Sequence, residues 1–268
     1  CDNSNIYTLS RPATELRIVL IGGRDNKHSS GKSSAGNIIL GHNVFDTSRR
    51  TAQSEARQQE VLGRRLTVVD TPGWWWNFPR EETPKLDQIE IQNSVHLCPP
   101  GPHVFLLVIP VGLYFFNLVK PSLKEHLELF KADVFSHTIV LFTAVHPYSD
   151  ETIESKIRRS PFLQWILQQC GNRKHVLNIS NRKDRDQVKM LLEKIEAMIE
   201  QNRGRHCSQI KQRILTEEEW NRREQELMER MMKALAKEPE KPIVPSVEVA
   251  GSKDDFYIPD SKFKMMKN

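Results

Sequence analysis

The chain has 268 residues, of which 38% are hydrophobic and 27% are charged. This length suits one large or two small domains, and a content of 12 Gly, 15 Pro and 4 Cys excludes a collagen-like chain, low-complexity disorder and a disulfide-rich miniprotein. The net charge of +5 is spread along the chain, so nucleic acid is not an expected partner. No apolar run reaches the roughly 18–20 residues of a membrane-spanning helix. Without a Cys-x-x-Cys pair or a secretory signal peptide, we expect a reduced, cytosolic protein.

Apolar runs and helical patterns alternate from residue 16 to residue 199. Short β-branched runs predict buried strands, and the segments between them have apolar residues at helical spacing. The expected strands are 16–21, 65–70, 104–109, 138–142 and 176–179, and the expected helices are 33–40, 86–95, 122–130, 151–170 and 186–199. This alternation predicts an α/β fold with a doubly wound, mainly parallel sheet flanked by helices.

The composition changes beyond Gln201. Residues 214–236 are rich in Glu and Arg, and Leu227, Met231 and Leu235 follow one another at intervals of four, which indicates an amphipathic helix. This helix either docks on its own domain or binds a partner or dimer helix, and the pattern leaves both open. We therefore expect a lead over 1–15, an α/β domain over 16–202, a helical extension over 203–238 and an irregular tail over 239–268.

The junction of the first strand and the first helix has the features of a phosphate-binding loop. The helix opens with Ser30, Gly31, Lys32, Ser33 and Ser34, so backbone N–H groups and the positive end of the helix dipole would face phosphate oxygens. The Lys32 ammonium would reach the β- and γ-phosphates, and the Ser33 hydroxyl would bind Mg²⁺.

This loop is four residues longer than the G-x-x-x-x-G-K-[ST] pattern allows. The residue five before Gly31 is Asn26, whereas the strand ends in Gly22 and Gly23. Removal of residues 26–29 would leave GGRDSGKSS, which satisfies the pattern with Gly22 in front, so we interpret them as an insertion. The inserted bulge either projects outward or distorts the cradle. A simpler alternative is a capped helix start in which the GKS has no function.

A second phosphate motif, DTPG, ends the next predicted strand. Its Asp70 would hold Mg²⁺ through the water shell, and the Gly73 N–H would contact a γ-phosphate. The two loops converge because the carboxyl ends of parallel strands meet at one edge of a sheet. A Thr after the first helix would complete the metal site. We take Thr51, although spacing does not separate it from Ser54.

These motifs resemble the immunity-associated GTPases, the GIMAP or AIG-type family. The resemblance rests on RIVLIGG, GKSSAGNIILG, GRRLTVVDTPGWW and the box LCPPGPHVFLLVIPVG, which occur in family order. It implies a P-loop NTPase G domain over 16–202 that binds GTP or GDP with Mg²⁺. It also implies homo- or hetero-oligomers formed through this domain, in the cytosol or at endomembrane surfaces.

The guanine site departs from the family pattern. Where the family has FTRKDD, with an Asp that accepts two hydrogen bonds from guanine, this chain reads FTAVHP and places His146 at the Asp position. A neutral imidazole offers one acceptor, so about 1–3 kcal/mol of base recognition is lost. The family's LNN appears as LNI, which keeps Asn178.

The residues that follow Gly73 bear on hydrolysis. They are Trp74, Trp75 and Trp76, with no Gln to orient an attacking water, so we expect intrinsic hydrolysis to be slow or absent. Relatives often supply an Arg at the position of Leu113, which leaves Arg80 as a candidate. We interpret the tryptophans as hydrophobic cover for the switch or as a dimer patch, rather than as a stacking surface for nucleotide.

The sequence thus predicts a GTP-binding switch or an oligomerising G domain. The alternative is a degenerate G domain that binds little nucleotide and acts as a protein-interaction scaffold, which the insertion and His146 favour. A P-loop phosphotransferase such as a nucleoside kinase fits less well, because no Arg-rich lid follows.

Overall fold

The structure is a computed structural model that describes residues 14–24, 30–115, 118–130, 133–146 and 149–207, together with 222, 224–229 and 232. The chain divides into two compact units, residues 1–212 and 213–268. In the second unit, residues 224–229 are helical and fall within the predicted amphipathic helix. The rest of that helix, the predicted tail and the predicted insertion over 26–29 lie outside the described residues.

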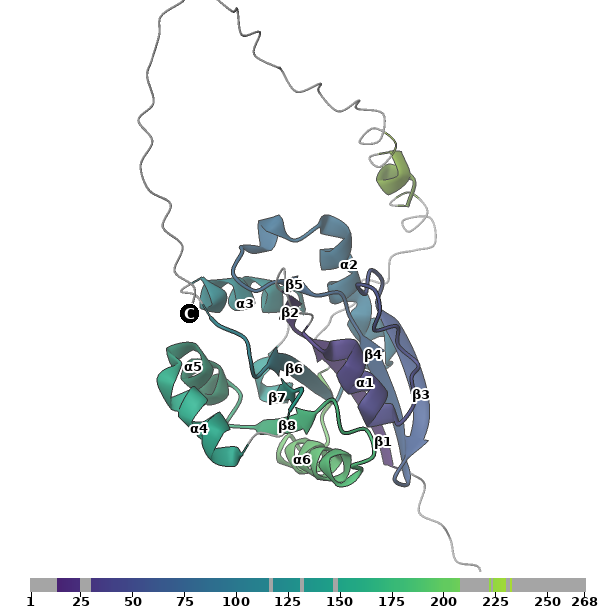
Figure 1. The fold of residues 1–268 in the computed structure, drawn as a ribbon. Coiled ribbons are helices and arrows are strands. Elements are labelled where there is room, and N and C mark those ends of the chain that lie inside the picture. The colour runs from purple at the N-terminus through teal and green to yellow at the C-terminus, as the bar shows by residue number, and fades with distance from the viewer. Residues whose placement is uncertain are drawn as a thin grey trace, which may run out of the picture. The chain divides into compact units, whose positions relative to one another are not determined.

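The first unit is built on a central sheet (Figure 1). Its strands run in the order β3-β4-β1-β6-β7-β8, where only the β3–β4 pairing is antiparallel. The bounds are β1 Thr14–Ile21, β3 Glu55–Val61, β4 Arg64–Asp70, β6 Val104–Pro110, β7 Thr138–Ala144 and β8 Lys174–Asn178. A separate two-stranded parallel ladder joins β2 (Gly23–Arg24) to β5 (Trp74–Trp75).

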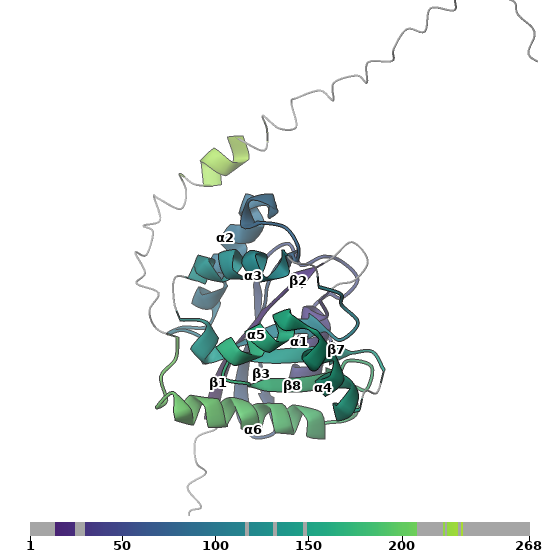
Figure 2. The same cartoon turned by 90° about the vertical axis from the view of Figure 1, so that its left-hand side faces the viewer.

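Helices cover both faces of the sheet (Figure 2). One face carries α1 (Lys32–Leu40) and α6 (Asp186–Gln201). The other carries α2 (Lys85–Asn93), α3 (Val119–Leu127), α4 (Asp150–Arg159) and α5 (Pro161–Gln169). Short 3₁₀ turns occupy Arg80–Glu82, Ser94–Leu97, Glu128–Phe130 and Phe135–His137. This arrangement confirms the predicted doubly wound α/β fold. None of the described helices is long and apolar enough to cross a membrane.

The core lies in two layers, one on each side of the sheet. In β1, Leu16, Ile18 and Leu20 pack toward α1 and α6, whereas Val19 and Ile21 pack toward the opposite helices. All five side chains are fully buried. Because a parallel strand with helices on both faces buries every side chain, its sequence is continuously apolar, which explains why such runs identified the strands. Each buried aliphatic side chain contributes about 1.5–3 kcal/mol to folding.

One strand of the central sheet, β3, was not expected from the sequence. Its residues, EARQQEV, are mostly exposed or half-buried, so they lack the apolar run that marks the central strands. The strand forms because Leu62 and Gly63, with φ values of 50° and 73°, turn the chain back along β4. Its charged side chains also protect the free edge of the sheet from pairing with another chain.

The helix expected over 151–170 is two helices. Pro161 has no N–H and restricts the residue before it, so Ser160 adopts an extended conformation with φ −113° and ψ 106°. The Ser160 hydroxyl then accepts a hydrogen bond from the Leu163 N–H and caps α5. Both helices bury apolar side chains in the same core layer.

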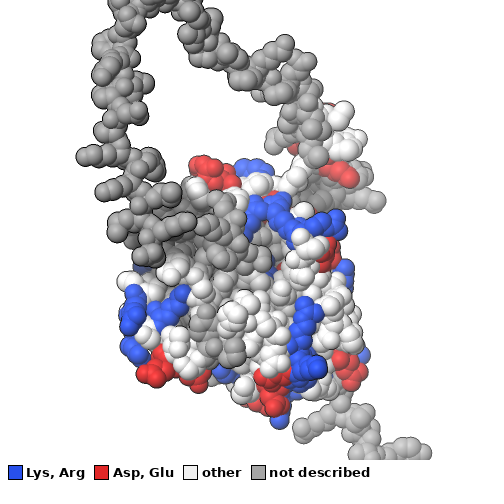
Figure 3. Space-filling model, viewed as in Figure 1, with Lys and Arg blue, Asp and Glu red and all other residues white. Residues whose placement is uncertain are grey.

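Both signs of charge occur around the rim of the face shown in Figure 3. One ion pair ties distant parts of the first unit together: the Arg64 guanidinium in β4 donates to both carboxylate oxygens of Glu196 in α6, at 2.6 and 2.8 Å.

Candidate functional site

Lys32 lies at the carboxyl edge of the sheet, in the first turn of α1. Its ammonium donates to the Gly22 carbonyl at 3.2 Å and to the Ser30 hydroxyl at 3.0 Å, and the residue is only 6% exposed. Burial lowers its pKa to about 8, a shift that Asp70 opposes and Arg24 increases. Within the described part of the chain, the desolvated ammonium thus has neutral oxygens as its hydrogen-bond partners, which favours its interaction with an anion.

The N-terminus of α1 leaves backbone donors beside this ammonium. Gly31 precedes the helix with φ 77° and has no side chain to cap it, and the first turn contains no acidic residue. The first N–H groups of a helix have no intrahelical acceptor, so those of Lys32, Ser33 and Ser34 remain for a ligand. Thr143, near the end of β7, holds the backbone in front of α1 in place, because its hydroxyl donates to the Ser30 carbonyl at 3.2 Å. Thr143 is not among the site residues predicted from the sequence.

The three predicted glycines other than Gly31 have different roles. A Cβ at Gly73 would lie 3.0 Å from Lys32 Nζ, so Gly73 borders the ammonium directly. A Cβ at Gly22 would lie 2.6 Å from the Val108 carbonyl oxygen, so only glycine brings the Gly22 carbonyl to Lys32. Gly23 instead packs against Trp76, whose ring would be 2.5 Å from a Cβ there.

Three oxygen-bearing side chains meet next to Lys32. The Ser33 and Thr51 hydroxyls donate to Asp70 Oδ2 at 2.6 and 2.9 Å and lie 3.3 Å from each other. Asp70 Oδ1 is buried and has no partner among the described residues. A cavity of about 250 Å³ reaches Thr51 and Asp70. Hydroxyl and carboxylate oxygens with one uncompensated carboxylate oxygen fit Mg²⁺, which prefers such ligands.

The structure separates the two candidates for the switch threonine. Ser54 points away from Asp70, because its hydroxyl donates to the Glu90 carbonyl and its N–H donates to the Glu90 carboxylate, both at 2.8 Å. Of the two, it is Thr51 that lies with Ser33 and Asp70.

A buried carboxylate near this site was not expected from the sequence. Asp87 of α2 is 1% exposed and accepts two hydrogen bonds from Arg50, at 2.5 and 3.1 Å. The Arg24 guanidinium lies 3.8 Å from the same carboxylate and 4.3 Å from the centre of the Trp75 ring. The only sequence signal for Arg24 is its place directly after the two glycines of the loop.

The predicted base-site residues follow neighbouring strands. Ala144 of β7 is paired with Asn178 of β8, and the Ser180 hydroxyl donates to the Val145 carbonyl, so the two strand ends are joined. The Asn178 carboxamide oxygen accepts from the Ser180 N–H at 3.0 Å. His146, two residues beyond β7, is exposed. The structure thus brings His146 and Asn178 to one edge, with Asn178 already engaged by its own turn.

The tryptophans after Gly73 belong to the core. Trp74 is fully buried and Trp76 is 2% exposed, and Trp74 stacks on His126 with ring centres 5.1 Å apart. Burial also lowers the pKa of His126. An exposed dimer patch at Trp74 and Trp76 is therefore wrong, because both rings are buried in the hydrophobic core. Trp75 is half-buried beneath Arg24.

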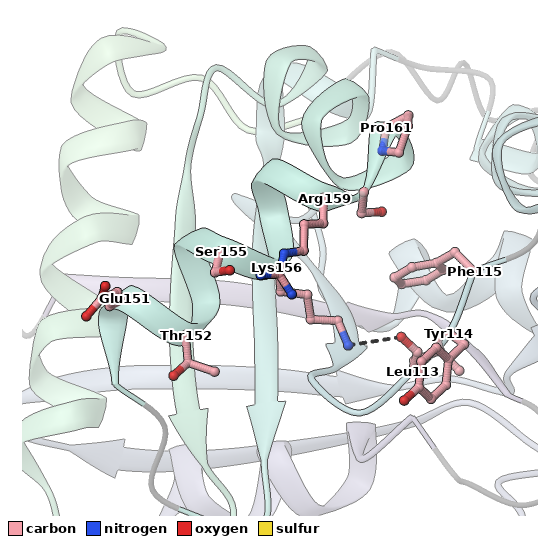
Figure 4. A pocket seen from close by; sticks show the side chains of 10 residues that line it. Leu113, Tyr114, Phe115, Glu151, Thr152, Ser155, Lys156, Arg159 and Pro161 are labelled. Carbon is pink, nitrogen blue, oxygen red and sulfur yellow. Dashed lines mark hydrogen bonds between the residues drawn. The ribbon is translucent and has the colours of Figure 1, made fainter.

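Neither position considered for a catalytic arginine provides one near Lys32. Arg80 faces α3, because its N–H donates to the Glu125 carboxylate at 2.8 Å and its guanidinium lies 3.8 Å from Glu128. Leu113 is buried and lines a separate cavity of about 640 Å³ between the loop after β6 and the junction of α4 and α5 (Figure 4). There the Lys156 ammonium donates to the Val111 and Leu113 carbonyls and holds that loop.

Solved structures of G domains have the same fold. Toc33 from Arabidopsis thaliana, in complex with GDP and Mg²⁺, superposes with a TM-score of 0.54 at 16% identity over 71% of this chain and 86% of that chain. A structure from the chloroplast translocon components atToc33 and psToc159, for which dimerization is important for the GTPase activity, gives a TM-score of 0.52 at 15% identity, over 69% of this chain and 83% of that chain. At these identities the likeness concerns the fold. The fold and the loop at Lys32 define a P-loop NTPase of the G-domain class.

Sequence comparisons narrow this class to a family. The AIG1 family profile matches residues 16–226. Immune-associated nucleotide-binding protein 5 of Arabidopsis thaliana is 30% identical over 83% of this chain and 72% of its own length. GTPase IMAP family member 8 of Homo sapiens is 31% identical over 72% of this chain and 28% of its own length. The chain belongs to the AIG1 family, as the sequence motifs predicted. It spans less than a third of the mammalian relatives that it matches.

Proposed function

We propose that this chain binds GTP or GDP with Mg²⁺ at the carboxyl edge of the sheet, as a nucleotide-dependent switch or an oligomerising G domain. The observation that carries this proposal is the placement of a desolvated ammonium and an uncapped helix N-terminus beside a carboxylate with one oxygen unpaired among the described residues. These groups complement a phosphate tail and its divalent ion.

Each residue has a distinct task in this proposal. The Lys32 ammonium and the N–H groups of Gly31, Lys32, Ser33 and Ser34 bind phosphate oxygens, with Ser30 orienting the ammonium. Gly73 brings its N–H to the terminal phosphate. Ser33, Thr51 and Asp70 hold Mg²⁺, which supplies charge compensation to the phosphates when bound.

We assign slow or absent intrinsic hydrolysis to this site. No Gln follows Gly73, Leu113 is apolar, and Arg80 is held at α3. G domains commonly place a water-orienting residue or a catalytic cation at these positions. At the described positions after Gly73, at Leu113 and at Arg80, this chain provides neither next to Lys32.

The relatives support the choice of ligand and of assembly. The two relatives reported above are named as a GTPase and as a nucleotide-binding protein. The structure of Toc33, which has the same fold, contains GDP and Mg²⁺. We extend this to oligomers formed through the G domain over 16–202, with the extension over 203–238 and the tail outside it. We place the protein in the cytosol, where contact with endomembrane surfaces remains part of the proposal.

The test is a titration of the full chain with fluorescent GTP and ATP analogues, in Mg²⁺ and in EDTA. We expect saturable binding that favours GTP and weakens in EDTA. Lys32→Ala should weaken binding at least about tenfold, because a charge-assisted contact is lost. Lys189→Ala, which removes an exposed lysine of α6, is the matched control and should leave affinity unchanged.

The predicted guanine-binding residues favour a second candidate function. In this candidate the chain is a degenerate G domain that acts as an interaction scaffold. His146 is exposed and the Asn178 carboxamide oxygen is occupied by Ser180, so little remains at these two residues to hold guanine. Absence of saturable binding to either analogue, with the chain folded, would establish this candidate and reject the first.

A further inference from the structure

Arg24 is an incompletely neutralised cation next to the phosphate-binding loop. Its side chain is 18% exposed and its Nε atom is buried; among the described residues that atom has no partner, and the Asp87 carboxylate lies 3.8 Å from the guanidinium. That distance is too long for a hydrogen bond. The guanidinium also contacts the face of Trp75, a weaker interaction than a direct bond to an anion.

The carboxylate beside Arg24 is already used by another arginine. Arg50 occupies both oxygens of Asp87, and the charge of Arg50 adds to burial in lowering the pKa of Arg24, while Asp87 opposes the shift. Two guanidinium groups thus share one buried carboxylate. An additional anion close to Arg24 would complete the charge balance without breaking the bond between Arg50 and Asp87.

The terminal phosphate of a bound nucleotide would lie within the same small region. A Cβ at Gly73 would be 3.0 Å from Lys32 Nζ and 3.6 Å from the Cβ of Arg24. Arg24 also lies close enough to Lys32 to contribute to its lowered pKa. A long, pivoting side chain that starts beside Gly73 reaches the place where the Lys32 ammonium would meet a γ-phosphate.

We propose that Arg24 binds the terminal phosphate of a nucleoside triphosphate and makes this chain prefer a triphosphate over a diphosphate. This inference rests on the proposed function, because it requires a nucleotide at Lys32. Trp75 and Asp87 hold the guanidinium beside the loop before binding. When a triphosphate binds, the guanidinium leaves the ring face and pairs with phosphate oxygens, a geometry that suits its fork of donors.

The experiment compares the affinities of the full chain for GTPγS and for GDP, both with Mg²⁺. Arg24→Gln should lower affinity for GTPγS about tenfold or more and change affinity for GDP less than about threefold. Arg24→Lys should give an intermediate ratio, since it keeps the charge without the fork. Arg49→Gln is the matched control, because the Arg49 side chain is 84% exposed and pairs with Asp46, so the ratio should stay as in the parent chain.

A purely structural role for Arg24 would reduce affinity for both nucleotides alike or for neither, and either result overturns the proposal.

A second readout uses the unmodified chain. GTPγS, but not GDP, should change tryptophan emission as the cation leaves Trp75, and Trp75→Phe should abolish that difference. Equal emission changes with both nucleotides would also overturn it. If the parent chain binds neither nucleotide, the proposed function fails together with this inference, whereas an unchanged ratio in Arg24→Gln overturns the inference alone.

Discussion

At the scale of single residues, the site depends on one buried ammonium. Lys32 tolerates burial because the Gly22 carbonyl and the Ser30 hydroxyl partly replace water, yet its pKa still falls to about 8. A neighbouring triphosphate would favour the charged form and raise this pKa again. In the proposed function, binding of nucleotide would therefore be linked to the protonation of Lys32.

This linkage predicts a pH dependence of affinity. Above pH about 8 the free site loses its proton while the bound site keeps it, so the affinity for GTPγS should fall with rising pH, approaching about tenfold per unit. Isothermal titration between about pH 7 and pH 9 measures this slope. Lys32→Arg, which does not titrate in this range, should bind with a flat profile. An equal slope in both proteins would assign the titration to another group.

The lowered pKa of Lys32 affects folding stability in the opposite direction: stability rises with pH where nucleotide affinity falls. Lys32 has a folded pKa of about 8 and an unfolded pKa near 10.5. Between these values the unfolded chain binds more protons, so this residue destabilises the fold below about pH 8 and the penalty disappears as the pH rises toward 10.5.

A second prediction at this scale concerns the base. His146→Asp restores the acceptor pair that guanine N1–H and its exocyclic amine require, so preference for GTP over ITP should increase about tenfold. The ratio of the two affinities in a competition titration measures this. Asn178 keeps its bond to the Ser180 N–H in either protein. A ratio that does not change would mean that the base does not lie beside His146.

At the scale of elements, one ion pair fixes the segment that carries Thr51. The segment between α1 and β3 is connected to α2 through the bond between Arg50 and Asp87, and the next residue, Thr51, donates to Asp70. The segment that carries Thr51 is thus held beside Asp70 by contacts within the chain.

Loss of this contact should loosen the segment locally. In Arg50→Gln we expect hydrogen exchange over residues 46–54 to accelerate about tenfold, as expected when a hydrogen bond to a charged group is lost. Exchange in β4 should not change. Arg49→Gln removes only the solvent-exposed pair with Asp46, which contributes little to stability, and should exchange like the parent chain. If hydrogen exchange over residues 46–54 accelerates equally in both variants, the segment is not held by Asp87.

Element boundaries also show where sequence patterns reach their limit. The apolar runs located β1, β4, β6, β7 and β8 because burial on two faces requires them. β3 carried no such signal, since its stability comes from pairing with β4 at a solvent-exposed edge. The split between α4 and α5 was readable from Ser160 and Pro161, but helical spacing continues on both sides and masks it.

At the scale of the whole molecule, the face of the sheet that carries α2 to α5 holds one continuous core, and three cysteines are part of it. Cys98, Cys170 and Cys207 are buried in that core as free thiols. Burial raises their pKa values to about 12, 12 and 11. Their reactive thiolate form is therefore scarce in the folded unit, and burial also keeps reagents from the sulfur atoms.

Thiol labelling should consequently report global unfolding. In a Cys1→Ser background at about pH 8, we expect all three cysteines to react with one slow rate, and to react rapidly in denaturant. GTPγS with Mg²⁺ should slow the native rate further, because binding stabilises the folded state. Mass spectrometry of the labelled chain measures the three rates. Fast native labelling of one cysteine alone would show a local opening instead of a shared core.

The sequence alone determined the fold class and the family and located the two loops that carry Lys32 and Asp70, because strand burial and tight turns restrict residue types locally and at fixed spacing. It did not distinguish Thr51 from Ser54, identify Thr143 as the support of the loop, or place Arg24 near Lys32 and Asp87 near Arg24. Those assignments depend on which segments meet at the edge of the sheet, and side chains from α2, β2 and β7 become neighbours of the loop only when the sheet is assembled. Contacts between residues far apart in the chain leave no periodic pattern, so the charge balance around Lys32 became visible only in the tertiary structure.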